Sequence, residues 1–367
     1  DRRIFSRGIQ PHVYAIAESN DIDTYTRDYF VNSDPLLKTA LDRIIHDLHD
    51  AKEYGSILTV APVDFAALYA RMDEVQNDIS FHREAVLNTI LPLIRVAEVL
   101  AQQYDVVVTN PPYLGSSRFS PLLDKYVKEN YADVKSDLSM VMYQAAINNF
   151  SKRYGFIAFI TTSSWMFLSS FEKLRDGLNH AATLYNLVDF GTELFDGKVG
   201  HNPIVSWVTR KAHIDYKMTA IRLVDYCYSR RDEKEPEFFN PKNRYTAQQS
   251  NFSKIPGSPV AYNFSSQVFD AFDKYERLLE YGITRLGMTT ASNETFVRLW
   301  HEVEIQNCHL VAENAEQVLA THAKWVPYNK GGAFRRWYGN MDCVVNWEND
   351  GYAIRHFGED TGHIRST

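Results

Sequence analysis

A run of valines that ends in two consecutive prolines is the strongest structural constraint in this chain. Three valines lie within residues 105–109, and Asn110, Pro111, Pro112 and Tyr113 follow directly. Valine-rich strands that are buried on both faces are typical of parallel sheets. Ligands of open α/β sheets bind just outside the carboxyl ends of the strands. The segment therefore predicts a buried strand over 105–109 that ends at a binding site.

The four residues after this strand suit the binding of an amino group. Asn110 offers a side-chain carbonyl as a hydrogen-bond acceptor, and Pro111 has a fixed φ and no N–H. Pro112 favours an extended Pro111, so the turn is stiff and its carbonyls keep one direction. Oδ1 of Asn110 and the main-chain carbonyl of Pro111 can together bind one –NH₂ group. Tyr113 supplies a flat face on which a base can stack.

Two fixed acceptors favour methyl transfer to an exocyclic amine such as that of adenine. The lone pair of that amine is delocalised into the ring, and acceptors that hold both N–H bonds pull the nitrogen towards tetrahedral geometry. The same oxygens stabilise the positive charge that develops on nitrogen, and alignment supplies much of the rate. A base in a duplex must flip out to reach such a site. The alternative is a purely structural turn, because Pro-Pro pairs often mark turns.

The turn resembles that of the amino-methyltransferases of the N6-adenine DNA class, whose signature is Asn-Pro-Pro-Tyr after a strand. The resemblance is strongest to the large methyltransferases of BREX and phage-growth-limitation systems and to the methyltransferase and recognition parts of type IIG restriction enzymes. It runs over nearly the whole chain. The stretches that carry it are 137–150, 155–165, 187–191, 202–208, 287–298, 330–340 and 345–347.

The resemblance implies an α/β fold, with a Rossmann-like class I methyltransferase sheet followed by an α+β target-recognition domain. It implies a partial catalytic domain over 1–211, a connector with a helix over 212–280 and a partial target-recognition domain over 281–367. It further implies site-specific adenine methylation of double-stranded DNA, S-adenosyl-L-methionine as the cofactor, and other defence-system proteins as partners.

The resemblance also assigns site residues. It implies that Tyr113 and Phe195 sandwich the flipped adenine, although Phe195 as a loop hydrophobe tucked into the core remains an alternative. It places Tyr54 and Gly55 near the adenine of the cofactor and Asp137 near the site. For Asp137 the alternative is an acid at a helix N-terminus, where the helix dipole stabilises it.

The last third of the chain supplies candidate DNA-binding residues by the same resemblance. Glycines allow the backbone to approach a phosphate, arginines contact phosphates or guanine edges, and aromatic rings are stacking platforms. The alternative is a β-rich domain with a surface arginine pair. The candidates are Lys330, Gly331, Gly332, Arg335, Arg336, Trp337, Tyr338 and Asn340.

A glycine-rich cofactor loop is the element of this class that the sequence does not show. Gly8 and Gly55 are isolated, and no Gly-x-Gly precedes residue 110 or follows residue 113. The resemblance places residue 1 just after the second strand of the sheet, so we expect an incomplete sheet that lacks its first strands. We therefore expect the strand before Asn110 to have an unpaired edge, and the chain alone to bind S-adenosyl-L-methionine weakly or not at all.

Composition limits the remaining function classes. The 367 residues are enough for two domains, and the net charge of −7 does not by itself suggest a nucleic-acid protein, although it says little about a local cleft. Three cysteines, Cys227, Cys308 and Cys343, lie far apart, which argues against zinc and disulfides and fits the cytoplasm. The most apolar stretch, 155–168, is shorter than the ~20 residues of a membrane helix.

Periodicity predicts most of the secondary structure. Residues 212–260, which hold a charge run and four prolines, read as a solvated connector. The sheet is expected to end with an antiparallel pair, 184–190 and 203–209, after strands at 105–109 and 156–161. Helices are expected over 35–52, most of 65–103, 120–130, 137–152, 170–180 and 264–281.

Two other functions fit the same residues. One is methylation of another amine, on a protein glutamine or an RNA guanine, because those enzymes share an Asn-Pro-Pro-aromatic turn. The other is a DNA-binding defence component without activity, against which the intact turn argues. Membership of a BREX system or of a type IIG restriction enzyme stays open.

Overall fold

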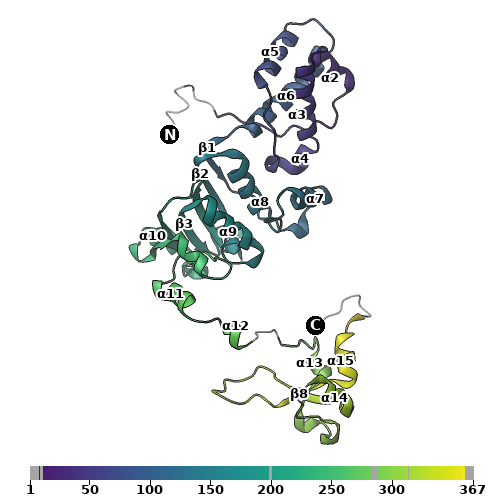
Figure 1. The fold of residues 1–367 in the computed structure, drawn as a ribbon, viewed down its shortest axis with the longest axis vertical. Helices are drawn as coiled ribbons and strands as arrows, with labels where there is room; N and C mark the ends of the chain where they lie inside the picture. The colour runs from purple at the N-terminus through teal and green to yellow at the C-terminus, as the bar shows by residue number, and fades with distance from the viewer. Residues whose placement is uncertain (1–7, 9–10, 198–200, 283–286, 313, 360–367) are drawn as a thin grey trace. The chain divides into compact units, whose positions relative to one another are not determined.

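The computed structural model describes residues 8, 11–197, 201–282, 287–312 and 314–359. These form two compact units, 1–276 and 277–367, which are described separately (Figure 1). The sequence predicted domain boundaries at residues 211 and 280. These boundaries differ from the division at residue 276 and remain a prediction.

The first unit begins with a helical subdomain. Its helices are α2 (Thr24–Val31), α3 (Pro35–Asp47), α4 (Ala51–Tyr54), α5 (Phe65–Gln76) and α6 (Arg83–Ala101). Asp34 caps α3 by accepting hydrogen bonds from the amides of Leu36 and Leu37, and proline occupies the first helical position. The apolar faces of these helices form one buried cluster that includes Phe30, Leu41 and Ile90.

Two of the expected helices are shorter than predicted. The helix expected over 35–52 ends at Asp47, where Leu48 leaves the helical conformation, and the left-handed Asp50 precedes a separate helix, α4. The helical region expected over 65–103 is two helices, because Asn77 ends α5 and a short loop precedes α6. Apolar periodicity continues across such a break, so the sequence pattern does not reveal it.

A six-stranded sheet forms the centre of the rest of the first unit. Its strands lie in the order β1-β2-β4-β3-β5-β6 (Figure 1). Strand β1 is parallel to β2, β4 is antiparallel to both β2 and β3, β5 is parallel to β3, and β6 is antiparallel to β5. The mixed sheet with its helices confirms the predicted α/β class and the antiparallel β3–β4 pair. The strands are β1 (Tyr104–Thr109), β2 (Ser151–Thr162), β3 (Thr183–Gly191), β4 (Ile204–Arg210), β5 (Lys217–Arg222) and β6 (Arg244–Gln248).

The strand directions bring four carboxyl ends to one edge of the sheet. Because β4 runs opposite to both of its neighbours, β2 and β3 point the same way, as do β1 and β5. The Asn110 turn, the loop after β2, the loop with Phe195 and the segment after β5 all leave from this edge.

Strand β1 is the edge strand and is not buried on both faces. Among the described residues it pairs with β2 alone, and the side chains of Val106 and Val108 are 55% and 71% exposed. The unpaired edge that the sequence led us to expect is therefore present, and β1 is not buried on both faces in this chain. A run of valines favours a strand, but it does not show whether that strand lies in the centre or at the edge of a sheet.

Residues 212–260 are not a solvated connector. Strands β5 and β6 lie within them and extend the sheet, and Met218, Ala220 and Ile221 of β5 are buried. The prediction failed because two strands of six and five residues leave little periodic signal between charges and prolines. The helix expected over 264–281 is also interrupted, into α11 (Ser266–Lys274) and α12 (Leu278–Tyr281).

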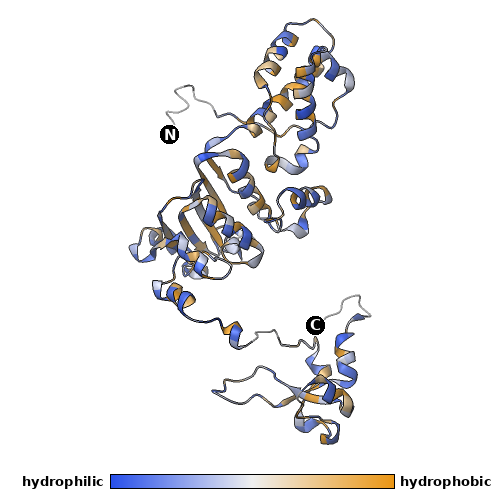
Figure 2. Ribbon diagram, in the orientation of Figure 1, coloured by the Kyte–Doolittle hydropathy of each residue, from blue (hydrophilic) through white to orange (hydrophobic). Residues whose placement is uncertain are grey.

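The sheet packs on helices α7 (Pro121–Asn130), α8 (Leu138–Ala145), which continues as a π-helix over Ala146–Phe150, and α9 (Glu172–Ala181). Figure 2 shows the apolar character of the strands against the mixed faces of the helices. Trp165 and Trp207 are fully buried and stack with ring centroids 4.1 Å apart.

The second unit is a small α+β fold. Strands β7 (Val297–Leu299), β9 (Cys343–Asn346) and β8 (Trp325–Tyr328) form an antiparallel sheet in that order. Helices α13 (Asn293–Phe296), α14 (Ala315–Thr321) and α15 (Glu348–Arg355) accompany it. In neither unit does a described helix have both the length and the apolarity needed to cross a membrane.

Candidate functional site

The turn after β1 is held by the hydroxyl group of Tyr113. This hydroxyl lies 2.9 Å from Oδ1 of Asn110 and 3.3 Å from the main-chain oxygen of Ile160 in β2, and both oxygens accept from it. Pro111 is buried whereas Asn110 is exposed, so proline anchors the turn and the amide faces outward. The bond from Tyr113 fixes the amide with its oxygen towards the ring, and that oxygen keeps a second lone pair for another donor.

Burial and a nearby carboxylate keep the Tyr113 hydroxyl protonated. Burial raises the pKa of Tyr113 above its usual value, and the charge of Asp137 raises it further. The hydroxyl therefore remains a donor to Asn110 throughout the neutral range.

Pairing between two loops brings Asp137 to the turn. Gly115 forms an isolated antiparallel bridge with Asp137, and the amide of Leu138 donates to the carbonyl of Leu114 at 2.9 Å. The carboxylate of Asp137 caps α8, accepting from the amide and the hydroxyl of Ser139 at 2.8 and 2.7 Å. The interpretation as a helix N-terminal acid is confirmed. Burial raises the pKa of Asp137 as well.

Tyr54 and Gly55 lie where the helical subdomain meets α7. The ring of Tyr54 stacks on Tyr126 of α7 with centroids 4.4 Å apart, and Gly55 has a φ of +61°. Both tyrosines line a cavity of about 650 Å³. Among the hydrogen bonds and ring pairs of the described residues, none joins Tyr54 or Gly55 to the Asn110 turn.

Phe195 lies in the loop that follows β3, and its side chain is half-buried. Adjacent strands are about 4.8 Å apart, so β1 and β3, three positions apart in the sheet, are separated by roughly 14 Å. The ring pairs found among the described residues do not include Tyr113 with Phe195. A base between these rings therefore requires the loop to reach along the edge of the sheet. Residues 198–200 of this loop lie outside the described residues.

The sequence around this turn matches a known protein family. The model of the Eco57I restriction-modification methylases matches residues 34–195, which include β1, the Asn110 turn, Asp137 and Phe195.

The similarity to individual methylases covers more of the chain. The whole chain is 34% identical to an adenine-specific methyltransferase, PglX, of Lacticaseibacillus casei, and 97% of it is 32% identical to the adenine-specific methyltransferase BrxX of Escherichia coli O9:H4. The chain spans 31% of the length of each. The predicted resemblance to these methyltransferases is confirmed.

One solved structure is weakly similar to part of this chain. It is a nuclease-deletion mutant of the Type ISP restriction-modification enzyme LlaGI in complex with a DNA substrate mimic. The match covers 56% of this chain and 23% of that chain, with 14% identity and a TM-score of 0.33.

The candidate DNA-binding residues lie together, on the loop between β8 and β9. Tyr328 pairs with Cys343 at the base of this loop, and the side chains of Trp337 and Tyr338 are 89% and 79% exposed. The guanidinium of Arg336 lies 5.8 Å from the ring centroid of Trp337. The other candidates on this loop are Lys330, Gly331, Gly332 and Arg335, all exposed, and Asn340, which is half-buried.

One contact at the Asn110 turn was missed by sequence reasoning. It is the main-chain oxygen of Ile160, which carries no residue-specific signal and is found only from the β1–β2 pairing. Across the described part of the chain, no group of three or more histidine, cysteine, aspartate or glutamate side chains is placed to hold a metal ion.

Proposed function

We propose that this chain is part of a site-specific DNA adenine-N6 methyltransferase that uses S-adenosyl-L-methionine and acts in phage defence or restriction-modification. The observation that carries the proposal is the Asn110 turn at the carboxyl end of β1, with its amide oxygen fixed by Tyr113. The names of the curated relatives, both adenine-specific methyltransferases, support adenine as the target.

The proposed chemistry needs acceptors rather than a nucleophile. The free lone pair of Asn110 Oδ1 and the carbonyl of Pro111 each accept one N6–H bond, which localises the nitrogen lone pair. As positive charge develops on the nitrogen, the same two oxygens stabilise it. Tyr113 and Phe195 stack on the flipped base in this proposal.

The bound cofactor would supply an electrophilic methyl group. Of its proposed binding residues, Asp137 pairs with Gly115 beside the turn, and Tyr54 stacks on Tyr126 of α7. Methylation sequencing of DNA from a host that carries the whole gene tests the function: N6-methyladenine at a defined site supports it. If the protein methylates only RNA or protein glutamine, adenine in DNA is not its target.

We expect Tyr113→Phe to lower the methylation rate about fivefold while DNA affinity stays unchanged. Phenylalanine keeps the stacking face but removes the hydrogen bond that orients Asn110, and one such bond contributes about 1 kcal/mol. Because burial and Asp137 raise the pKa of Tyr113, we expect the ratio of wild-type to variant rates to stay constant between about pH 6 and pH 9. Single-turnover methylation assays measure the rates of the wild type and the variant. Equal rates would exclude the role of Tyr113 in orienting Asn110.

The exposed β8–β9 loop is proposed to contact DNA. We expect the double variant Arg335→Ala, Arg336→Ala to weaken DNA binding and to lower the slope of log K against log[salt] by about 2, because each phosphate contact releases about 0.9 of a counterion. Fluorescence anisotropy at several salt concentrations measures this slope. Lys38→Ala is the matched control, since Lys38 lies on α3 in an exposed ion pair with Asp42. A slope equal to that of the control would reject the loop as a phosphate-binding element.

A further inference from the structure

The segment after β5 makes a set of polar contacts that the proposed methyl transfer has not used. It runs from Leu223 through a 3-10 helix, Tyr228–Glu233, into α10 (Lys234–Phe238). Lys234 belongs to the charge run that was expected to face solvent, yet it is only 7% exposed. A lysine buried to this degree needs partners for all of its N–H bonds.

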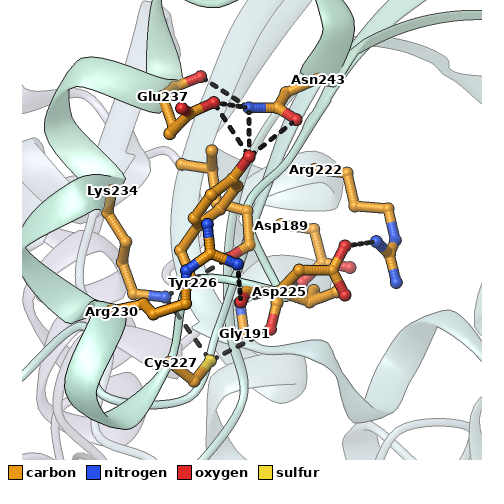
Figure 3. A network of polar contacts seen from close by, with 12 residues as sticks. Asp189, Gly191, Arg222, Asp225, Tyr226, Cys227, Arg230, Lys234, Glu237 and Asn243 are labelled. Atoms are coloured by element: carbon orange, nitrogen blue, oxygen red, sulfur yellow. Dashed lines mark hydrogen bonds and ion pairs between the residues drawn. The ribbon is translucent and has the colours of Figure 1, made fainter.

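The partners of Lys234 lie at the carboxyl edge of the sheet. Its ammonium donates to the main-chain oxygen of Phe190 at 2.6 Å and to that of Leu223 at 3.4 Å. It also lies 3.6 Å from the sulfur of Cys227 (Figure 3). Phe190 lies in β3, and Leu223 directly follows β5. One side chain therefore joins the ends of two parallel strands.

Backbone packing reinforces this junction. Gly191 at the end of β3 has a φ of +66°, and a Cβ there would lie 2.8 Å from Cα of Val224, so the segment after β5 lies directly against it. The amide of Leu223 donates to the carbonyl of Asp189 at 2.7 Å. The buried carboxylate of Asp189 accepts from the hydroxyl of Tyr262 at 2.8 Å.

Further contacts lie on both sides of Phe195 in the sequence. Before it, the thiol of Cys227 donates to the carbonyl of Thr192 at 3.5 Å, and the amide of Tyr228 donates to the carboxylate of Glu193. After it, Arg231 forms an ion pair with Asp196 at 2.6 Å. The loop over 191–196 is therefore held from one side by residues 223–234.

Residues 223–234 are themselves fixed to the following part of the chain. The hydroxyl of Tyr226 donates to the carboxylate of Glu237 at 2.9 Å, and Asn243 donates to the same oxygen at 2.8 Å (Figure 3). The guanidinium of Arg230 lies 4.6 Å from the ring centroid of Tyr226. These contacts anchor the segment independently of the Phe195 loop.

We infer that residues 223–234 are a brace that positions the Phe195 loop over the flipped base, with Lys234 as its central positioning residue. The inference rests on the proposed function, since the base is the target of that reaction. Phe195 must reach along the edge of the sheet from β3, and a stacking ring that is displaced by about 1 Å costs up to 10²-fold in rate.

The test is Lys234→Met in the full-length protein, which removes the three donors and keeps the length of the side chain. We expect kcat to fall about tenfold with KM for DNA changed less than about twofold, because the positioning of the base is affected rather than DNA binding. We expect 2-aminopurine placed at the target adenine to report less flipped base. Lys211→Met is the matched control, because Lys211 also donates to a main-chain carbonyl, that of Ser151 at 2.9 Å, but at the opposite edge of the sheet.

A double variant separates positioning from general stability. If Lys234 acts through Phe195, Lys234→Met lowers kcat by less than about twofold when Phe195 is already alanine. An additive loss in that background overturns the inference, as does a Lys234→Met enzyme with wild-type kcat.

Hydrogen exchange tests the brace without a measurement of enzyme activity. We expect amides 191–197 to exchange at least about tenfold faster in Lys234→Met than in Lys211→Met. Unchanged exchange overturns the brace even if the enzyme methylates adenine, whereas faster exchange in a protein without adenine methylation rejects only the proposed function. If Lys234→Met does not fold, Arg231→Gln gives the same test, because the side chain of Arg231 is partly exposed and contacts Asp196. Faster exchange of amides 194–197 in this variant supports the brace. Exchange at the wild-type rate overturns it.

Discussion

Replacing Asn110 with alanine in the full-length protein is expected to lower DNA adenine methylation by roughly 10³-fold while DNA affinity stays within about twofold. The substitution removes one of the two proposed acceptors for the target amine, and the loss of one preorganised group of this kind costs about 10²–10³ in kcat. It also leaves the Tyr113 hydroxyl without its shorter hydrogen bond. Because Asn110 is exposed, no cavity forms and the fold is expected to remain.

Two further variants make this result specific. Asn110→Asp keeps an acceptor for Tyr113 and for the amine, so we expect it to retain more activity than alanine. Asn77→Ala at the end of α5 is the control, since Asn77 bonds only to its own helix, at the carbonyl of Asp73. Methyl transfer to duplex DNA measures the rates. If Asn110→Ala methylates as fast as Asn77→Ala, the assigned role of the turn is wrong.

The part of the candidate site that the sequence predicts is the part encoded by consecutive residues. Asn110, Pro111, Pro112 and Tyr113 are consecutive, and the stiffness of two prolines does not depend on the rest of the fold. The hydrogen bond from Tyr113 to Asn110 spans three residues, so the turn contains its own orienting contact.

The contacts that sequence reasoning missed come from distant segments. Tyr113 contacts the main-chain oxygen of Ile160, which lies 47 residues along the chain and reaches the turn only through the β1–β2 pairing. Lys234 was assigned to a solvated charge run because its neighbours are charged, and its burial depends on the ends of β3 and β5 meeting it. Short strands such as β5 and β6 are missed for a related reason: their identity is set by the sheet that they join.

The edge position of β1 agrees with the unpaired edge that the sequence led us to expect. Three valines predicted the strand, and among the described residues it pairs on one side only. The side chains of Val106 and Val108 are exposed there. Local composition therefore predicted the strand, whereas the exposure of its side chains depends on the strands around it.

The largest expected loss of stability is that of Trp207→Ala, at about 3–5 kcal/mol. Trp207 is fully buried in β4, stacks on Trp165 at 4.1 Å and lies 4.2 Å from the ring centroid of Tyr143. Its indole N–H donates to the hydroxyl of Thr161 in β2 at 3.1 Å. Alanine would leave a cavity between the sheet and its helices and remove the donor to a buried hydroxyl.

Trp207→Phe refines this prediction. Phenylalanine fills most of the volume but cannot donate to Thr161, so we expect a smaller loss of about 1–3 kcal/mol. Hydrogen exchange of the β4 amides measures the local free energy of opening in each variant. Trp300→Ala is the control, because that side chain is 51% exposed and lies in the second unit. A Trp207→Ala protein as stable as this control would show that the stacked tryptophans do not hold the sheet against its helices. The Asn110 turn is joined to β2 through Ile160, next to Thr161, so opening of β2 in Trp207→Ala is also expected to loosen Tyr113.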